Sequence, residues 1–144
     1  MSQMSDYLEN KLIDHIFRNT AYSVPTTVYI GLFTATPSDT GGGTEVSGGN
    51  YARVQVGPST STWNGTHGNT TGASSGTGGQ TSNASTITFP APSASWGSIT
   101  SIGIFDASTG GNLLFWGPLT TSKTVNNGDP APTFPATTLT VTLA

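Results

Sequence analysis

The 144-residue sequence contains no cysteine, which excludes disulfide bonds, thiolate nucleophiles and cysteine-ligated zinc. Charge is also scarce: Asp, Glu, Lys and Arg make up 8% of the chain, about a third of their usual share. The four cations, Lys11, Arg18, Arg53 and Lys123, are scattered and the net charge is −3. Because nucleic acids are bound through several Lys/Arg–phosphate contacts, we expect no nucleic-acid partner.

Long hydrophobic runs are missing as well. No apolar stretch approaches the roughly 20 residues of a membrane span, so we expect no membrane partner. The first residues, MSQMSDYLENKL, are acidic and polar and lack the hydrophobic region of a signal peptide. The sequence therefore predicts a protein that is made and assembled inside a cell, with release by lysis.

Thr, Ser, Gly and Asn supply about half of the chain, and low charge distinguishes it from most disordered sequences. Short segments of strand-forming residues recur with turn signals between them. The expected strands cover residues 27–34, 51–56, 86–89, 99–106, 113–116, 123–125 and 138–143. This pattern predicts an all-β fold, a β-sandwich or jelly-roll-like antiparallel barrel, as one domain over residues 1–144.

One short helix is expected at residues 5–18, before the strands begin. Ser5 is a suitable N-cap, and Asn19 can end the helix. Leu8, Leu12 and Ile16 recur every four residues and form an apolar stripe. A helix this short is marginal alone, so the stripe needs a surface, either the chain's own sheet or a neighbouring subunit. We treat these three residues as a candidate docking face.

Two strands have clear burial patterns. Residues 27–34 are apolar on both faces, which is typical of a central strand covered on both sides. In the last strand, Leu139, Val141 and Leu143 alternate with threonines and are expected to face the core.

Residues 57–85 form the most unusual stretch, nearly all Gly, Ser, Thr and Asn. Loops this long are usually functional or disordered, so we expect an excursion from the sheet or a protruding arm. Trp63 and His67 are its candidate contact residues, for the body of the protein or for a partner. Its Asn-x-Ser/Thr sequons, at Asn64, Asn69 and Asn83, are expected by chance in such a composition.

Catalytic groups are few. The chain has two histidines, His15 on the expected helix and His67 in the long loop, and no serine-nucleophile or phosphate-loop motif. Asp39, Asp106 and Asp129 fall at turns, where aspartate commonly bonds the backbone. Calcium-loop spacing is absent. We expect no enzyme activity, no cofactor and no metal.

Aromatic residues leave one alternative open. Trp63, Trp96 and Trp116 could line a sugar-binding face, which would make the chain a lectin. Core packing is the expected role of Trp96 and Trp116, because large rings gain most from burial.

Several segments in a fixed order resemble a known family. They are TVYIGLFTATP (27–37), GGNYARVQV (48–56) and WGSITSIGIFDASTGGNLLFWGPL (96–119), followed by a Thr-rich closing strand. The order is similar to that of small structural proteins of tailed-bacteriophage virions, catalogued as tail-fibre-like or minor structural proteins. The resemblance covers most of the chain outside residues 57–85. It implies a non-enzymatic virion component, assembled in the host cytoplasm.

The resemblance leaves the place in the virion open. A capsid decoration or cement protein on the head exterior is favoured, because the chain has no coiled coil or repeated shaft. A tail-fibre or head-fibre module that binds host-surface glycan is the alternative. The partners expected are the major capsid protein or tail components, together with other copies of the chain, a homotrimer being favoured.

Overall fold

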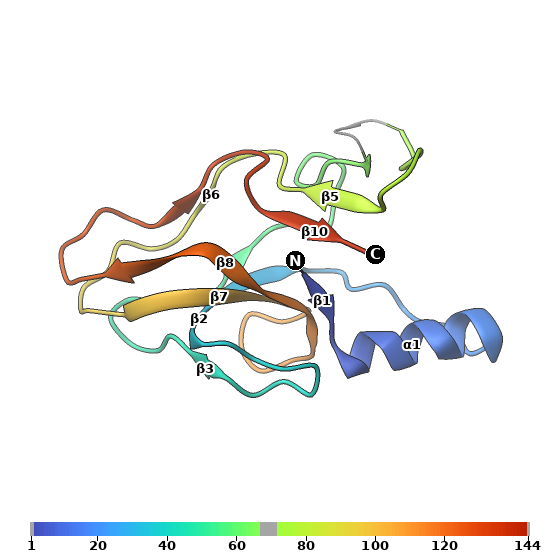
Figure 1. Cartoon of the computed structure of the whole chain (residues 1–144), viewed down its shortest axis with the longest axis horizontal. Coiled ribbons are helices and arrows are strands. Elements are labelled where there is room, and N and C mark those ends of the chain that lie inside the picture. The colour runs from blue at the N-terminus through green and yellow to red at the C-terminus, as the bar shows by residue number, and fades with distance from the viewer. Residues whose placement is uncertain (1, 67–71, 144) are drawn as a thin grey trace.

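The computed structural model describes residues 2–66 and 72–143 (Figure 1). These residues form one helix and ten strands. In chain order the elements are β1 (Gln3–Met4), α1 (Asp6–Phe17), β2 (Tyr29–Ala35), β3 (Thr44–Glu45), β4 (Val54–Gln55), β5 (Gln80–Ser82), β6 (Ile87–Thr88), β7 (Gly97–Phe105), β8 (Leu113–Val125), β9 (Thr133–Phe134) and β10 (Thr140–Thr142). Every strand pairing is antiparallel. The prediction of an all-β fold with one short N-terminal helix is confirmed.

The main sheet has the order β1-β8-β7-β2-β3, with β4 also paired to β2. Its centre is the β7–β8 hairpin and the neighbouring β2 strand. Ile104 of β7 lies opposite Ile30 of β2 on one side and opposite Phe115 of β8 on the other. Two small sheets, β5–β10 and β6–β9, lie beyond this sheet.

The principal core lies between the main sheet and the two small sheets. Ile30 and Leu32 of β2 are in this core, as is Ile104 of β7. From the small sheets come Ile87 of β6 and Val141 of β10, each nearly inaccessible to solvent. The chain thus has two β layers that share one apolar interior.

The opposite face of β2 carries a second, smaller apolar group. Phe33 and Phe105 stack there with ring centroids 6.1 Å apart, and Leu113 completes the group. The prediction that this strand is covered on both faces is therefore confirmed. Gly31 and Gly103 pair across β2 and β7 on this same face. A Cβ on Gly103 would lie 2.8 Å from the Phe105 ring and 2.9 Å from the Phe33 ring, so the absent side chain makes room for the rings.

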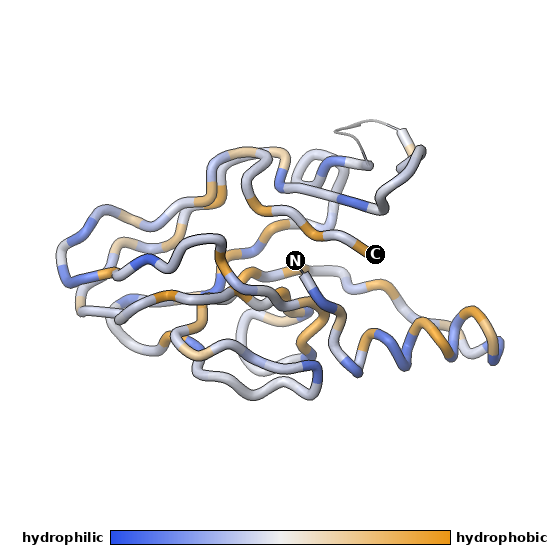
Figure 2. Tube along the Cα trace, viewed as in Figure 1, coloured by the Kyte–Doolittle hydropathy of each residue, from blue (hydrophilic) through white to orange (hydrophobic). Residues whose placement is uncertain are grey.

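Helix α1 begins and ends as the sequence predicts. The Ser5 hydroxyl accepts a hydrogen bond from the Leu8 N–H, and Asn19 adopts a left-handed conformation with φ of 53° just after the helix. Leu8 is the one buried residue of the helix. Figure 2 shows further hydrophobic positions along the end of the helix that projects away from the sheets.

Several details differ from the sequence-based expectation, and the short strands β1, β3 and β9 were not expected. The strand expected at 51–56 is reduced to β4, and the segments expected at 113–116 and 123–125 belong to one strand, β8. The stretch 57–85 contains β5, which pairs with β10. Leu143 is 57% exposed and does not face the core, because β10 ends at Thr142 and the alternation of buried and exposed residues ends with it. Among the described residues, no helix is long and apolar enough to cross a membrane.

Candidate interaction surfaces

From here on, the arm means residues 6–27, which comprise helix α1 and the segment that returns to β2. Residues 57–85 are called the long loop. Its base is fixed at both ends. The Ser5 N–H donates to the Leu114 carbonyl over 3.0 Å, and the Ser5 hydroxyl donates to the Leu113 carbonyl. At the other end, the N–H of Val28 donates to the Gly57 carbonyl over 2.9 Å. The arm therefore leaves the body from two anchored points that flank the sheet.

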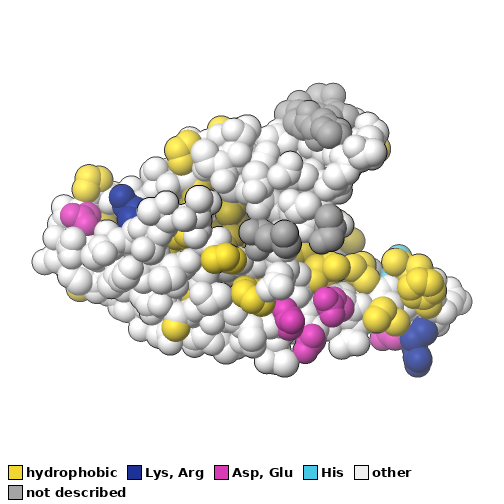
Figure 3. Space-filling model, viewed as in Figure 1, with side chains coloured by type: hydrophobic (Ala, Val, Ile, Leu, Met, Phe, Trp, Pro, Cys, Tyr) yellow, Lys and Arg dark blue, Asp and Glu magenta, His cyan; other side chains and the backbone are white. Residues whose placement is uncertain are grey.

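The outer part of the arm exposes large hydrophobic side chains. Ile16 is 65% exposed, Phe17 78% and Val24 77%, and Ile13 is half exposed. Figure 3 shows hydrophobic side chains gathered on this projecting end. Scattered surface hydrophobics need no explanation, but several together on one projection are typical of a contact surface.

Hydrogen bonds within the arm hold this surface in place. The Thr20 N–H donates to the Asp14 carbonyl over 3.0 Å, and the Tyr22 N–H donates to the Nδ1 atom of His15 over 3.1 Å. Arg18 and Asp14 form an ion pair of 2.9 Å one turn apart, which contributes little because both are exposed. The pKa of the Tyr22 hydroxyl is raised, chiefly by burial of Tyr22 and also by the neighbouring Tyr7 and Asp106. The return segment thus follows the helix closely.

The predicted docking face divides between these two parts. Leu8 is buried against the chain's own body, Leu12 is half-buried, and Ile16 is exposed. The stripe therefore packs on the chain's own body at Leu8 and is exposed to solvent at Ile16. The exposed residues Ile13 and Phe17 widen the free surface beyond the predicted stripe.

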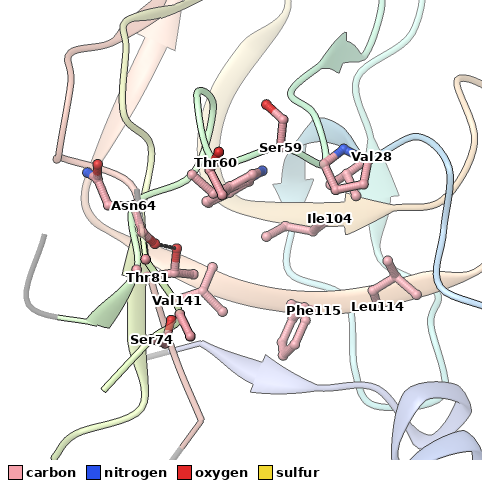
Figure 4. A pocket seen from close by; sticks show the side chains of 15 residues that line it. Val28, Ser59, Thr60, Asn64, Ser74, Thr81, Ile104, Leu114, Phe115 and Val141 are labelled. Carbon is pink, nitrogen blue, oxygen red and sulfur yellow. Dashed lines mark hydrogen bonds between the residues drawn. The ribbon is translucent and has the colours of Figure 1, made fainter. Parts of the chain in front are cut away.

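A groove of about 600 Å³ lies beside the base of the arm (Figure 4). Its apolar walls come from Val28, Trp63, Ile104, Leu114, Phe115 and Val141. Its rim carries hydroxyl and amide groups, among them those of Ser59, Thr60, Asn64, Ser74 and Thr81. None of the described residues that line the groove is charged. The groove is therefore suited to an apolar partner and not to an ionic one.

Trp63 positions the first part of the long loop on the body. Its indole Nε1–H donates to the Val56 carbonyl over 2.7 Å, and the ring packs against the principal core while lining the groove. The Thr81 hydroxyl donates to the Asn64 carbonyl, which ties the two sides of the loop together. His67, the other predicted contact residue of this loop, lies outside the described residues.

A second recess, here called the polar cleft, opens on the other side of the arm's base. It also has a volume of about 600 Å³. Asp6, Tyr7 and Asp39 line it together with Glu45 and Arg53. The Asp39 carboxylate accepts a hydrogen bond of 3.1 Å from the Trp116 indole. The cleft thus offers carboxylate acceptors and one tyrosine ring.

An ion-paired network forms the floor of the polar cleft. Arg53 donates to both carboxylate oxygens of Glu45, each over 2.7 Å, and its guanidinium lies 3.4 Å from the centre of the Phe105 ring. Arg53 also donates to the carbonyls of Ala107 and Gly110 in the β7–β8 turn. The network joins β3, the segment before β4 and this turn.

Tyr51 completes the network. Its hydroxyl donates to Glu45 over 2.8 Å and accepts from the Leu32 N–H over 2.9 Å. Burial, followed by the nearby Glu45 charge, raises the pKa of Tyr51 well above the usual tyrosine range, against the opposing effects of the Leu32 N–H and Arg53. Each group is used in holding strands together, so the network has a structural role.

Two of the three turn aspartates, Asp106 and Asp129, accept backbone hydrogen bonds as the sequence predicts, whereas the Asp39 carboxylate accepts from the Trp116 indole. Asp106 accepts from the backbone N–H and the side-chain amide of Asn112, each over 2.7 Å. Asp129 accepts from the Asn126 N–H over 2.7 Å. Across residues 2–66 and 72–143, no group of three or more His, Asp or Glu side chains is placed to hold a metal ion.

The three tryptophans differ in burial and in position. Trp96 is buried, as predicted, and its indole donates to the Gly49 carbonyl over 2.8 Å. Trp116 is half-buried beside the Phe33–Phe105 group. These rings come from separate regions of the fold and do not form one sugar-binding face with Trp63, which lines the groove.

Sequence reasoning missed the groove as a site. Its walls combine residues from β2, the long loop, β7, β8 and β10, which no local pattern brings together. The partial signal was Trp63, a large ring among polar residues. Asn64 and Asn83, which begin two of the sequons, have side chains that are buried and hydrogen-bonded.

Comparison with known proteins gives one family. Residues 3–142 match the family model described as podophage GP4 fiber I protein gp80. No curated protein sequence matches the chain. The match includes both the arm and the strands that form the groove and the polar cleft.

Proposed function

The chain belongs to the podophage GP4 fiber I protein gp80 family, and from that premise we propose that it is a building block of a virion fibre. Membership makes the chain a structural protein of the phage virion. The observation that carries the finer proposal is the extent of the family match, residues 3–142 of 144. The proposal treats residues 1–144 as one domain, which the shared core from Val28 to Val141 supports.

The fibre role proposed here needs no catalysis. Its essential property is contact with other virion components, and the arm and the groove supply apolar surface for such contacts. We include in the proposal that copies of the chain contact one another. A homotrimer is the assembly expected from the resemblance to small phage structural proteins.

Capsid decoration is the second candidate. Within residues 2–66 and 72–143 there is one 12-residue helix and no extended shaft. A projecting arm with an apolar end would also suit docking on a head surface. Fibre and decoration differ in position on the particle, so location distinguishes them.

Immunogold labelling of purified particles with antibodies against the whole chain tests the proposal. Gold at fibres supports it, whereas gold spread evenly over the head favours decoration. Particles that remain unlabelled, although the denatured particle proteins react with the same antibody, would point to a buried internal location and contradict both candidates.

Attachment to a host-surface glycan is a further part of the fibre proposal. The polar cleft is the better candidate for it, because sugar hydroxyls donate hydrogen bonds to carboxylates such as that of Asp39, and the C–H faces of sugars stack on rings such as that of Tyr7. We expect the purified chain to bind host-cell glycans and the Asp39→Asn variant to bind them at least about tenfold more weakly. The matched control is Lys123→Ser, which lies outside the cleft. Equal binding by the two variants would remove the cleft from the proposal.

A further inference from the structure

We propose that the arm of one copy of this chain inserts its apolar end into the groove of a neighbouring copy. The proposal rests on the fibre role proposed above and names the partner of its contact surfaces: a second copy of the same chain. The occupant of the groove would be the surface formed by Ile13, Ile16, Phe17 and Val24.

The arm is held away from its own groove. Its two anchors, at Ser5 and Val28, contact residues that line or adjoin the groove, so the arm begins at the groove's edge and points outward. Figure 3 shows a hollow between the projecting helix and the lobe that carries β5 and β10. A helix of 12 residues extends about 18 Å, so Ile16 and Phe17 lie far beyond their own anchors. The apolar end is thus available to another molecule.

Arm and groove match in charge and in polarity. The described groove lining carries no charge, and its walls are aliphatic and aromatic. The arm's exposed apolar residues come from α1 and the adjoining return segment, while Asp14 and Arg18 pair with each other. A charged partner would lose hydration in this groove without gaining a counter-ion. The arm would instead bury a phenylalanine and aliphatic side chains, whose removal from water favours docking.

The arm is ordered before it binds. The hydrogen bonds at Thr20 and Tyr22 fix the return segment against the helix, so little conformational entropy remains to be lost on docking. This distinguishes the arm from a flexible tail, whose affinity would be reduced by the cost of ordering it.

The contact is heterologous, because two different surfaces of the same chain meet. Each copy supplies one arm and one groove, so every copy can bind two neighbours. Such a contact closes into a ring when the rotation between copies allows it, and otherwise continues as a filament. A closed ring of three copies would satisfy the expected trimer, and an open arrangement would extend along a fibre.

Sedimentation velocity of the full chain and two variants tests the inference. The arm variant carries Ile16→Ser and Phe17→Ser, both at exposed positions. The groove variant carries Thr60→Arg, which places a cation at the rim. Lys11→Ser, on another side of the same helix, is the matched control. Thermal unfolding checks that each protein is folded; if Thr60→Arg unfolds the chain, Ser59→Arg at the same rim replaces it.

We expect the wild-type chain and the control to associate, and each variant alone to associate at least about tenfold more weakly. Mixing the two variants should give a 1:1 heterodimer and nothing larger, because the intact arm of one fits the intact groove of the other. A monomeric wild-type chain, an arm variant that associates normally, or a mixture without heterodimer would each overturn the inference. None of these results would change where antibodies label the particle, so the fibre proposal is tested separately.

Discussion

At the scale of single residues, the Asn83 side chain ties the small sheets together. It is completely buried, and its amide N–H groups donate to the carbonyls of Ser85, Phe134 and Pro135. Its Oδ1 atom accepts from the Leu139 N–H over 2.9 Å. One side chain thus bonds backbone groups in β9 and in the segments that connect the two small sheets.

Asn83→Ala should lower the free energy of unfolding by about 2–4 kcal/mol, because it leaves several buried backbone groups without partners. Urea denaturation measures the change. Ser101→Ala is the control: among the described residues, its hydroxyl is the buried side-chain group that has no hydrogen-bond partner. Its removal should cost less than about 1 kcal/mol. Equal costs for the two variants would contradict the role given to Asn83.

Tyr51 gives a prediction in pH. Its pKa is raised in the folded chain, chiefly by burial, so its stabilising contribution is complete below the unfolded value of about 10 and is lost as the pH rises above it. The difference in unfolding free energy between wild type and Tyr51→Phe should therefore shrink from about pH 9 to pH 11. Denaturant titrations at several pH values measure it. A difference that stays constant or grows over this range would contradict the assignment.

At the scale of elements, close contact between β2 and β7 depends on the glycine pair Gly31 and Gly103. Added methyl groups would collide with different neighbours on the two strands. At Gly31 a Cβ would lie 2.8 Å from the Glu45 carboxylate, and at Gly103 it would lie among the Phe33, Phe105 and Leu113 side chains. The pair therefore determines how the smaller apolar group and the Glu45 network pack.

Gly103→Ala should destabilise the chain by about 1–3 kcal/mol, because the rings must move from their packed positions. Thermal unfolding and near-ultraviolet circular dichroism measure the loss of stability and of ring packing. Gly110→Ala is a useful comparison, since a Cβ there meets nothing within 4 Å and the cost is limited to its positive φ of 59°. If Gly103→Ala were as stable as wild type with an unchanged aromatic signal, the packing argument would fail.

The helix and the principal strands could be predicted because their signals are local. Ser5 and Asn19 mark the helix, and the apolar residues on both faces of β2 indicate a covered strand. The continuity of β8 through Pro118 was not predicted, because a proline interrupts the local strand pattern. In the structure Pro118 of β8 pairs with Ser101 of β7, next to a shift of register. Non-local pairing overrides the local break there.

The candidate sites were predictable only in part, because they depend on contacts between residues far apart in the sequence. The repeat of Leu8, Leu12 and Ile16 marked a docking surface, but it could not tell that the chain's own body covers Leu8 and leaves Ile16 exposed. The groove depends on tertiary contacts that place Trp63 near Val141, far away in the sequence. Residues 57–85 were expected to form an excursion from the sheet, although Trp63 and Asn83 anchor them through buried contacts.

At the scale of the whole molecule, a two-layer body carries an apolar projection beside the apolar groove (Figures 1 and 3). The low charge of the chain, −3 over 144 residues, limits electrostatic steering and leaves shape and apolar burial as the main sources of affinity. These properties suit a protein that assembles with copies of itself into a permanent structure. Family membership makes the chain a structural component of a phage virion.

A cryo-electron microscopy reconstruction of the particle, at a resolution that traces the chain, tests the fibre role most directly. The account predicts that the chain lies in a virion fibre, with the end of each arm at Phe17 seated in a neighbour's groove. Finding the chain on the head shell, or finding it absent from the mature particle, would contradict that role.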